Sequence, residues 1–268
     1  MRSSHAVLLY IVVSVVLSLP LLAEISRNVG PKDAPQNQLK AVELSHPRLF
    51  ELKRDTDDEL ESIVMRDYVV PDEARRRELA DWHRKPRKQE DSILIAATLT
   101  NAYAQDPPDW PVLCVALSAA YKGVSDPRIL EIARELLTTA AELPDEAMIA
   151  VGAALEILAL TGKSEDIELL KKSASRAFLG VKVDAGFQGF VGGHREFLCQ
   201  VALQALFLYA PLDQAIVALK SVRDSLHPDS VGFDGFIRSL AESYLNQLER
   251  IRKGEKVSLP ILDPVPLD

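Results

Sequence analysis

Apolar helical runs recur along this chain at intervals of about 38 residues. The centres of successive runs lie 38, 38, 48 and 38 residues apart, at Leu79, Leu117, Leu155, Leu203 and Ala241. A pair of helices repeated in this way cannot bury its apolar faces alone, so it has to stack on its neighbours. The repeat therefore predicts an all-α fold, built as a right-handed α-solenoid of paired antiparallel helices.

The second helix of each pair is expected to begin about nine residues after the centre of the preceding run. Asp126, Ser164 and Leu212 occupy these positions, each at or beside the start of another amphipathic segment. Asp126-Pro127 is a common combination at the N-cap and first residue of a helix. Apolar spacing and helix-end signals predict a repeat domain at 56–253 that contains about nine helices. The expected helices lie at about 72–84, 91–104, 111–121, 127–140, 147–160, 164–178, 194–209, 212–226 and 233–252.

One of these helix pairs resembles the HEAT-like α-solenoid repeats. Its matching positions are Asp145-Glu146, Ala153-Ala154-Leu155, Gly162, and then Ile167 and Leu170 in the partner helix. The resemblance covers about Pro71–Arg252, and Asp126-Pro127-Arg128 is similar to a turn of the family. Armadillo-like or tetratricopeptide-like pairing are the alternatives, although the period is not 34 residues. The resemblance implies a scaffold that binds a protein along a helical-repeat surface.

Charge is distributed unevenly along the chain. The net charge of −8 argues against general nucleic-acid binding, which needs a basic surface. Residues 51–61 hold six acids and two bases, whereas residues 75–88 hold seven bases and two acids. The two stretches either screen each other on a solvated face or leave a basic patch for anionic lipid head groups.

The N-terminus predicts a membrane or an exported location. Residues 6–23 form an uncharged apolar stretch preceded by Arg2. Eighteen apolar residues can just span a bilayer, so residues 1–23 are a signal anchor or a cleaved signal peptide. We favour the anchor, with the helical domain extracytoplasmic; cleavage would make the protein secreted or periplasmic. Residues 24–55 show no sustained period and are expected to be a linker.

A glycine-rich segment at 179–193 accounts for the longer repeat step. Insertions in repeat proteins often mark the binding face, so Phe187 and Phe190 are candidate partner-binding anchors. The alternative is that both rings fold back and fill the gap between two repeats. His194, Arg195 and Glu196 follow the segment, and an enzyme or enzyme subunit would place its acid or base there. An exposed first helical turn is the simpler interpretation.

One polar position recurs in the repeat register. Ser118, Glu156, Gln204 and Glu242 occupy equivalent places in successive runs. Glu156, Gln204 and Glu242 are therefore candidate partner-binding residues in a polar ladder on the concave surface. The alternative is that each residue lies at the solvated edge of its helix.

Other chemical signals are weak. Cys114 and Cys199 lie in apolar runs and are expected in the core. The sequence has no metal-binding pattern, cofactor motif or catalytic motif, so we expect a scaffold without a cofactor. A structural spacer at an envelope surface is a further alternative. The proline-rich tail, 254–268, is expected to be extended, either along the domain or docked by another protein.

Overall fold

The structure is a computed structural model that describes residues 35–123, 126–181 and 194–259. These residues are all-helical, which confirms the all-α prediction: they form eleven α-helices and two 3-10 turns, with no strand. The apolar stretch 6–23, Phe187 and Phe190 lie outside the described residues. Within those ranges, no helix combines the length and apolar character needed to cross a membrane.

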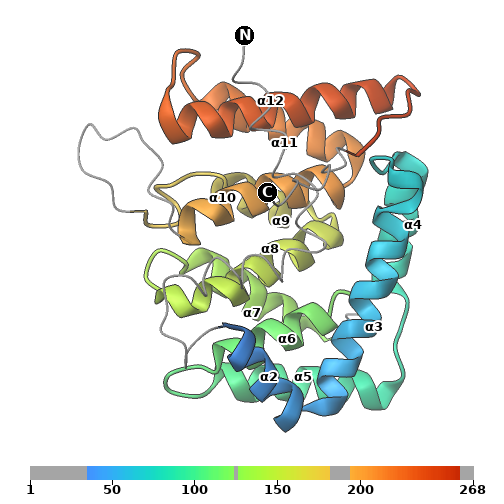
Figure 1. The fold of residues 1–268 in the computed structure, drawn as a ribbon, viewed down its shortest axis with the longest axis vertical. Helices are drawn as coiled ribbons and strands as arrows, with labels where there is room; N and C mark the ends of the chain where they lie inside the picture. Colours follow the sequence, from blue (N-terminus) through green and yellow to red (C-terminus); the bar gives the residue numbers. More distant parts are fainter. Residues whose placement is uncertain (1–34, 124–125, 182–193, 260–268) are drawn as a thin grey trace, which may run out of the picture.

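Eight of the helices form two layers. The inner layer consists of α6 (Trp110–Ala119), α8 (Met148–Thr161), α10 (His194–Leu208) and α12 (Gly232–Arg252), each packed on the next. The outer layer consists of α5 (Gln89–Tyr103), α7 (Pro127–Thr138), α9 (Ser164–Ser173) and α11 (Leu212–Ser225). Each outer helix packs on the inner helix that follows it or precedes it in the chain (Figure 1).

Four members of the sequence repeat lie in the inner helices of these two layers. Leu117, Leu155, Leu203 and Ala241 are fully buried, one in each of the four inner helices. The outer helices α9 and α11 begin at Ser164 and Leu212, and Asp126 caps α7 by accepting a hydrogen bond from the Arg128 N–H at 2.9 Å. A local rule explains the start of α7: the capping carboxylate satisfies an N–H group that has no partner within the helix.

The linker prediction for 24–55 is wrong from residue 35 onward. Helices α2 (Pro35–Ser45) and α3 (Pro47–Val64) occupy this region, and Leu49, Leu52 and Leu60 of α3 are buried. Lys53 and Thr56 are buried among the leucines of α3. Its buried face has helical spacing, but polar residues interrupt its hydrophobic pattern.

The first member of the repeat, Leu79, does not belong to the stack. It lies in α4 (Glu73–Arg84), which packs against α8 and α3, and α3 is the helix that packs extensively on α6. We call α3, the 3-10 turn η2 (Arg66–Tyr68) and α4 the arm. Figure 1 shows the arm running across the layers at one edge of the stack. The 38-residue step from Leu79 to Leu117 is therefore not a repeat of the packing unit.

The described start of the C-terminal tail lies along the domain. The Val70 N–H donates to the Val257 carbonyl at 2.8 Å, and the Leu259 N–H donates to the Tyr68 carbonyl at 2.7 Å. Val257 and Leu259 are both buried. These contacts join the chain after α12 to the connection between α3 and α4, which fixes the arm to the far end of the stack.

Candidate functional site

The predicted polar ladder is mostly covered. Ser118 and Gln204 are each 6% exposed, and Glu156 is only partly exposed. Glu242 retains more exposure and pairs with Arg223 of α11 at 3.3 Å. The four positions are equivalent in the repeat register, but they do not form a continuous polar surface. The ladder prediction is therefore wrong for Ser118 and Gln204, which are buried, whereas Glu156 and Glu242 are partly exposed.

The arm is the reason for this burial at the α6 end. Thr56 of α3 is buried, and its hydroxyl lies 3.5 Å from the carbonyl of Ala119, the last residue of α6. Arg87 donates to the Ala119 and Lys122 carbonyls at 2.7 and 2.9 Å. The carbonyl groups at the end of a helix have no partner within it, so these contacts satisfy groups that would otherwise need water.

A cluster of ionisable side chains lies between the arm and the inner layer. Lys53 donates to Asp57 within α3 at 2.5 Å, and the Tyr121 hydroxyl donates to Glu156 of α8 at 2.5 Å. We call these residues, with their neighbours on α6, the inner cluster: Lys53, Asp57, Cys114, Ser118, Tyr121 and Glu156. Buried polar groups are costly unless paired, and the described contacts pair them within the protein.

Burial governs the protonation of the inner cluster. It raises the pKa of Glu156 to about 7, and it raises the pKa of Asp57 despite the opposing effect of Lys53. Burial also raises the pKa of Cys114 to about 11 and that of Tyr121 well above its usual value. At neutral pH, Cys114 is thus a thiol and a poor nucleophile, whereas Glu156 can gain or lose a proton.

The described residues contain no group of three or more His, Cys, Asp or Glu side chains placed to hold a metal ion. Cys114 and Cys199 are both free, and Cys199 is buried in α10, as expected for a core residue. Chemically, the inner cluster can hold and exchange a proton. It has no arrangement that activates a nucleophile at neutral pH.

Much of the basic stretch at 75–88 fixes the arm in place. Arg76 is buried and donates to the carbonyls of Phe207 and Ala210, at the end of α10, at 2.5 and 2.6 Å. His83 donates through Nδ1 to the carbonyl of Tyr121 at 2.5 Å. Arg77 pairs with an acid of its own helix. These contacts favour internal use and screening of the positive charge over a lipid-binding patch.

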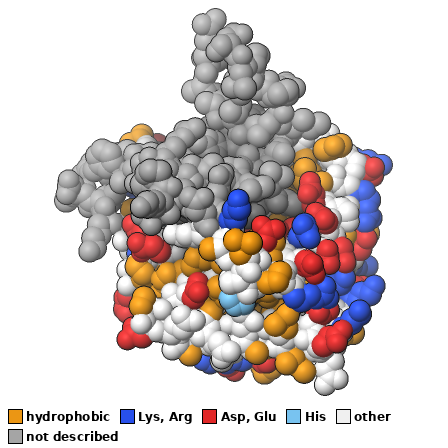
Figure 2. All heavy atoms as spheres, turned by 60° about the horizontal axis from the view of Figure 1, so that its bottom comes forward, with side chains coloured by type: hydrophobic (Ala, Val, Ile, Leu, Met, Phe, Trp, Pro, Cys, Tyr) orange, Lys and Arg blue, Asp and Glu red, His pale blue; other side chains and the backbone are white. Residues whose placement is uncertain are grey.

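Figure 2 shows the end of the molecule that carries α2 and α5. Basic and acidic side chains lie intermixed toward the right of this view, whereas its centre is largely hydrophobic or uncharged. Leu44 of α2 and Ile93 of α5 are large apolar side chains that remain exposed. Single exposed apolar residues are common on folded proteins and do not by themselves define a site.

His194, Arg195 and Glu196 do not assemble into one site. Arg195 donates to the carbonyls of Ala140 and Leu179 at 2.6 and 2.8 Å. Glu196 is fully buried and pairs with Arg176 at 2.5 Å. Both charged side chains therefore join α10 to the segment after α9, and Arg195 also joins it to the chain after α7. This arrangement accounts for both of them structurally, and it removes the main support for an enzyme site at these positions.

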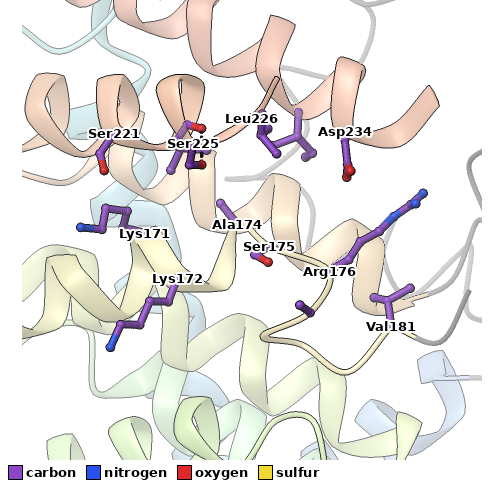
Figure 3. Close-up of a pocket in the computed structure, with 13 residues that line it drawn as sticks. Lys171, Lys172, Ala174, Ser175, Arg176, Val181, Ser221, Ser225, Leu226 and Asp234 are labelled. Atoms are coloured by element: carbon purple, nitrogen blue, oxygen red, sulfur yellow. Dashed lines mark hydrogen bonds between the residues drawn. The ribbon is translucent and has the colours of Figure 1, made fainter. Parts of the chain in front are cut away.

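A groove that the sequence did not predict lies between α9 and the α11–α12 pair. Its volume is about 620 Å³. Figure 3 shows side chains from the two sides of the groove facing each other. Lys171 and Ser221 lie toward one end, and Arg176 and Asp234 lie toward the other. The remaining lining includes serine hydroxyls and apolar groups, among them Ser175, Ser225, Ala174, Val222, Leu226 and Ile237.

Two of the three cations that line the groove, Lys171 and Arg176, have partners within the chain. Lys171 pairs with Glu168 at 2.6 Å. Arg176 pairs with Glu196, and its guanidinium carbon lies 4.4 Å from the centre of the Phe233 ring. A strong isolated anion site would need convergent cations, and these side chains do not converge. Serine hydroxyls beside apolar groups suit a polypeptide segment better.

Comparison with known proteins gives no match at any of three levels. No family model matches the chain, and neither a curated protein nor a solved structure is similar to it. A proposal for its function therefore has to come from the groove, the inner cluster and the packing described above.

Proposed function

We propose that this protein is a membrane-tethered, extracytoplasmic scaffold that binds another protein along a helical-repeat surface. Its helical domain is proposed to be a right-handed HEAT-like solenoid. The alternation of inner and outer helices in chain order supports this proposal, as does the recurrence of buried centres at Leu117, Leu155, Leu203 and Ala241. Inner α8 is apolar almost throughout, as expected for a helix covered on most sides.

The observation that carries the binding proposal is the groove beside α9. It opens between α9 and the α11–α12 pair, and its polar and apolar lining could receive an extended segment of a partner. Phe187 and Phe190 are proposed as further anchors, since they belong to the segment that enters α10. The partner would then contact one end of the stack.

A matched pair of variants tests the groove. Ser175 and Ser221 are exposed residues of its two sides, so a Ser175→Trp/Ser221→Trp double variant should fill it without disturbing the core. Ser62→Trp places the same ring on an exposed position of α3, outside the groove. The measurement is affinity purification of the full-length chain from detergent-solubilised membranes, with mass spectrometry of the companions.

The expected result is a near-stoichiometric companion that copurifies with the wild type and with Ser62→Trp but not with the groove variant. A companion that stays with both variants would contradict the groove as its binding site. A Phe187→Ser/Phe190→Ser variant would then test the glycine-rich segment. A solitary wild-type protein would contradict the scaffold and favour the structural spacer.

The proposed location needs its own experiment. We propose that residues 6–23 span the membrane once and that the helical domain lies outside the cytosol. Carbonate extraction separates an integral protein from a released one, and protease added to intact cells or spheroplasts reports the side of the domain. Release by carbonate together with a shortened N-terminus would establish cleavage and a secreted or periplasmic protein.

A further inference from the structure

The groove between α9 and the α11–α12 pair carries different charges at its two ends. Lys171 and Lys172, in the last turn of α9, lie toward the same end as Ser221 in Figure 3. Asp234, in the first turn of α12, is the one acid among the described lining residues and lies toward the opposite end. A molecule that fills the groove therefore meets lysines at one end and a carboxylate at the other.

The carboxylate of Asp234 is available to a bound molecule. Asp234 is exposed, and within the described residues its side chain makes no hydrogen bond or ion pair. Arg176 lies at the same end, but its guanidinium pairs with Glu196 at 2.5 Å and lies 4.4 Å from the centre of the Phe233 ring. A free carboxylate accepts charge-assisted hydrogen bonds, so this end of the groove suits a cationic side chain.

The lysine end is available as well. The Lys171 ammonium group lies 2.6 Å from Glu168, one turn back on α9, and the Glu168 side chain is 56% exposed. Because ion pairs at such exposed positions contribute little stability, Lys171 can exchange Glu168 for a carboxylate of a bound molecule. Lys172 is exposed and makes no ion pair within the described ranges. This end of the groove suits an acidic side chain.

Uncharged groups line the groove between these ends. Ser175 and Ser221 lie on its two sides, and neither hydroxyl has a hydrogen-bond partner within the part of the chain that the structure describes. A hydroxyl both donates and accepts, so it can pair with the N–H or the carbonyl of an extended backbone. Ala174, Val222 and Ile237 add apolar surface for small side chains. The middle of the groove therefore suits a short uncharged stretch of polypeptide.

We infer that the groove binds a segment of its partner in one direction, with an acidic side chain at Lys171 and a basic side chain at Asp234. Small uncharged residues of the segment lie between them, against Ser175 and Ser221. Reversal of the segment would place like charges together, so the charges select the orientation as well as the partner. This inference rests on the proposed protein-binding function and specifies the chemistry of the partner.

The same charges also suit the helix ends that carry them. A cation in the last turn of α9 and an acid in the first turn of α12 both interact favourably with the helix dipoles. That contribution changes the stability of the fold and does not depend on a bound segment. A measurement of binding therefore separates the two roles.

Peptide selection on the full-length protein in detergent tests the inference. The probe is a phage-displayed library of random linear peptides, and peptides that bind equally well to the Ser175→Trp/Ser221→Trp variant are discarded. The wild type should enrich sequences that carry an acid and a base at a fixed separation and in one order. The charge-reversed variant Lys171→Glu/Asp234→Lys should enrich the opposite order at the same separation.

Neutral variants measure the contribution of each end. Fluorescence anisotropy of a selected peptide should show binding weakened about two- to five-fold by Lys171→Gln or by Asp234→Asn, the effect of losing one exposed ion pair. High salt should reduce both effects. Lys40→Gln and Asp58→Asn remove exposed charges of α2 and α3, outside the groove, and should leave the affinity unchanged. These single variants keep the test decisive if the charge-reversed variant does not fold.

Two results would overturn the inference and leave the proposed function in place. One is a set of groove-dependent peptides without a fixed order of charges, and the other is the same order selected by the wild type and the charge-reversed variant. A selection that yields no groove-dependent peptide would also overturn the inference. A solitary wild-type protein in the copurification experiment would contradict the proposed function itself.

Discussion

The inner layer and the arm are both buried, but different interactions hold them. Helix α8 buries a nearly continuous set of apolar side chains, whereas the buried residues of α4 are Arg76, Leu79, Trp82 and His83. Apolar contact is non-directional and scales with area, while hydrogen bonds to carbonyl groups need particular distances and angles. The comparison predicts that the stability of the stack depends on how completely its apolar side chains fill the core. The attachment of the arm should instead depend on hydrogen-bond geometry and on protonation.

The largest effect is expected from a cavity in the inner layer. Leu155 is fully buried at the centre of α8, so Leu155→Ala should lower the free energy of unfolding by about 3–5 kcal/mol. Urea unfolding followed by circular dichroism measures this change. Leu44→Ala, at an exposed position of α2, is the control and should change stability by less than about 0.5 kcal/mol.

Arg76→Met, in the arm, should lower the free energy of unfolding by about 3 kcal/mol. The methionine fills similar space but leaves the carbonyls of Phe207 and Ala210 buried without their donors. Arg77→Met is the matched control, because Arg77 is exposed and pairs only with Glu73 on the next turn back. Equal destabilisation by the two substitutions would contradict the carbonyl-capping role of Arg76.

The contribution of the inner cluster to the free energy of unfolding should change by about 2 kcal/mol with pH, whereas that of the apolar stack should not change. The pKa of Glu156 is raised in the folded state, so the folded protein binds a proton more tightly than the unfolded chain. This contribution is greatest at low pH and declines as the pH rises from about 5 to 8. The stability of Glu156→Gln relative to the wild type should therefore increase over this range.

His83 contributes an opposing pH dependence, but it is present in both the wild type and Glu156→Gln. Its effect cancels in the difference between their free energies of unfolding. Burial lowers the pKa of His83, so that residue destabilises the fold at acid pH in both. Parallel urea titrations at each pH measure the difference. A difference that stays constant from pH 5 to 8 would show that Glu156 titrates as it does in the unfolded chain.

The smallest effect is expected at the attachment of the tail. Val257 is buried where residues 257–259 pair with the connection between α3 and α4. Val257→Ala should cost about 1–2 kcal/mol, since two methyl-sized groups leave an apolar contact. Hydrogen exchange should rise first in the arm. Faster exchange in α8 than in α4 would contradict the tail as a support of the arm.

Sequence periodicity predicted the helices of the two layers well. The starts at Ser164 and Leu212, the cap at Asp126 and the left-handed glycine after α8 all follow from local chemistry. Local rules failed at α3, where Lys53 and Thr56 occupy the buried face. They also failed at Glu156, because a polar residue on an apolar helix has the same spacing whether it faces solvent or another helix.

The sequence by itself determined that the chain is all-α and where its layered helices begin and end. These features depend on neighbours within about one helical turn and on the need to cover apolar faces. The tertiary structure decided what covers those faces. Arg76 meets its carbonyl partner 131 residues away at Phe207, and the tail meets the arm across nearly the whole domain. Such contacts depend on three-dimensional placement, which the spacing of apolar residues does not encode.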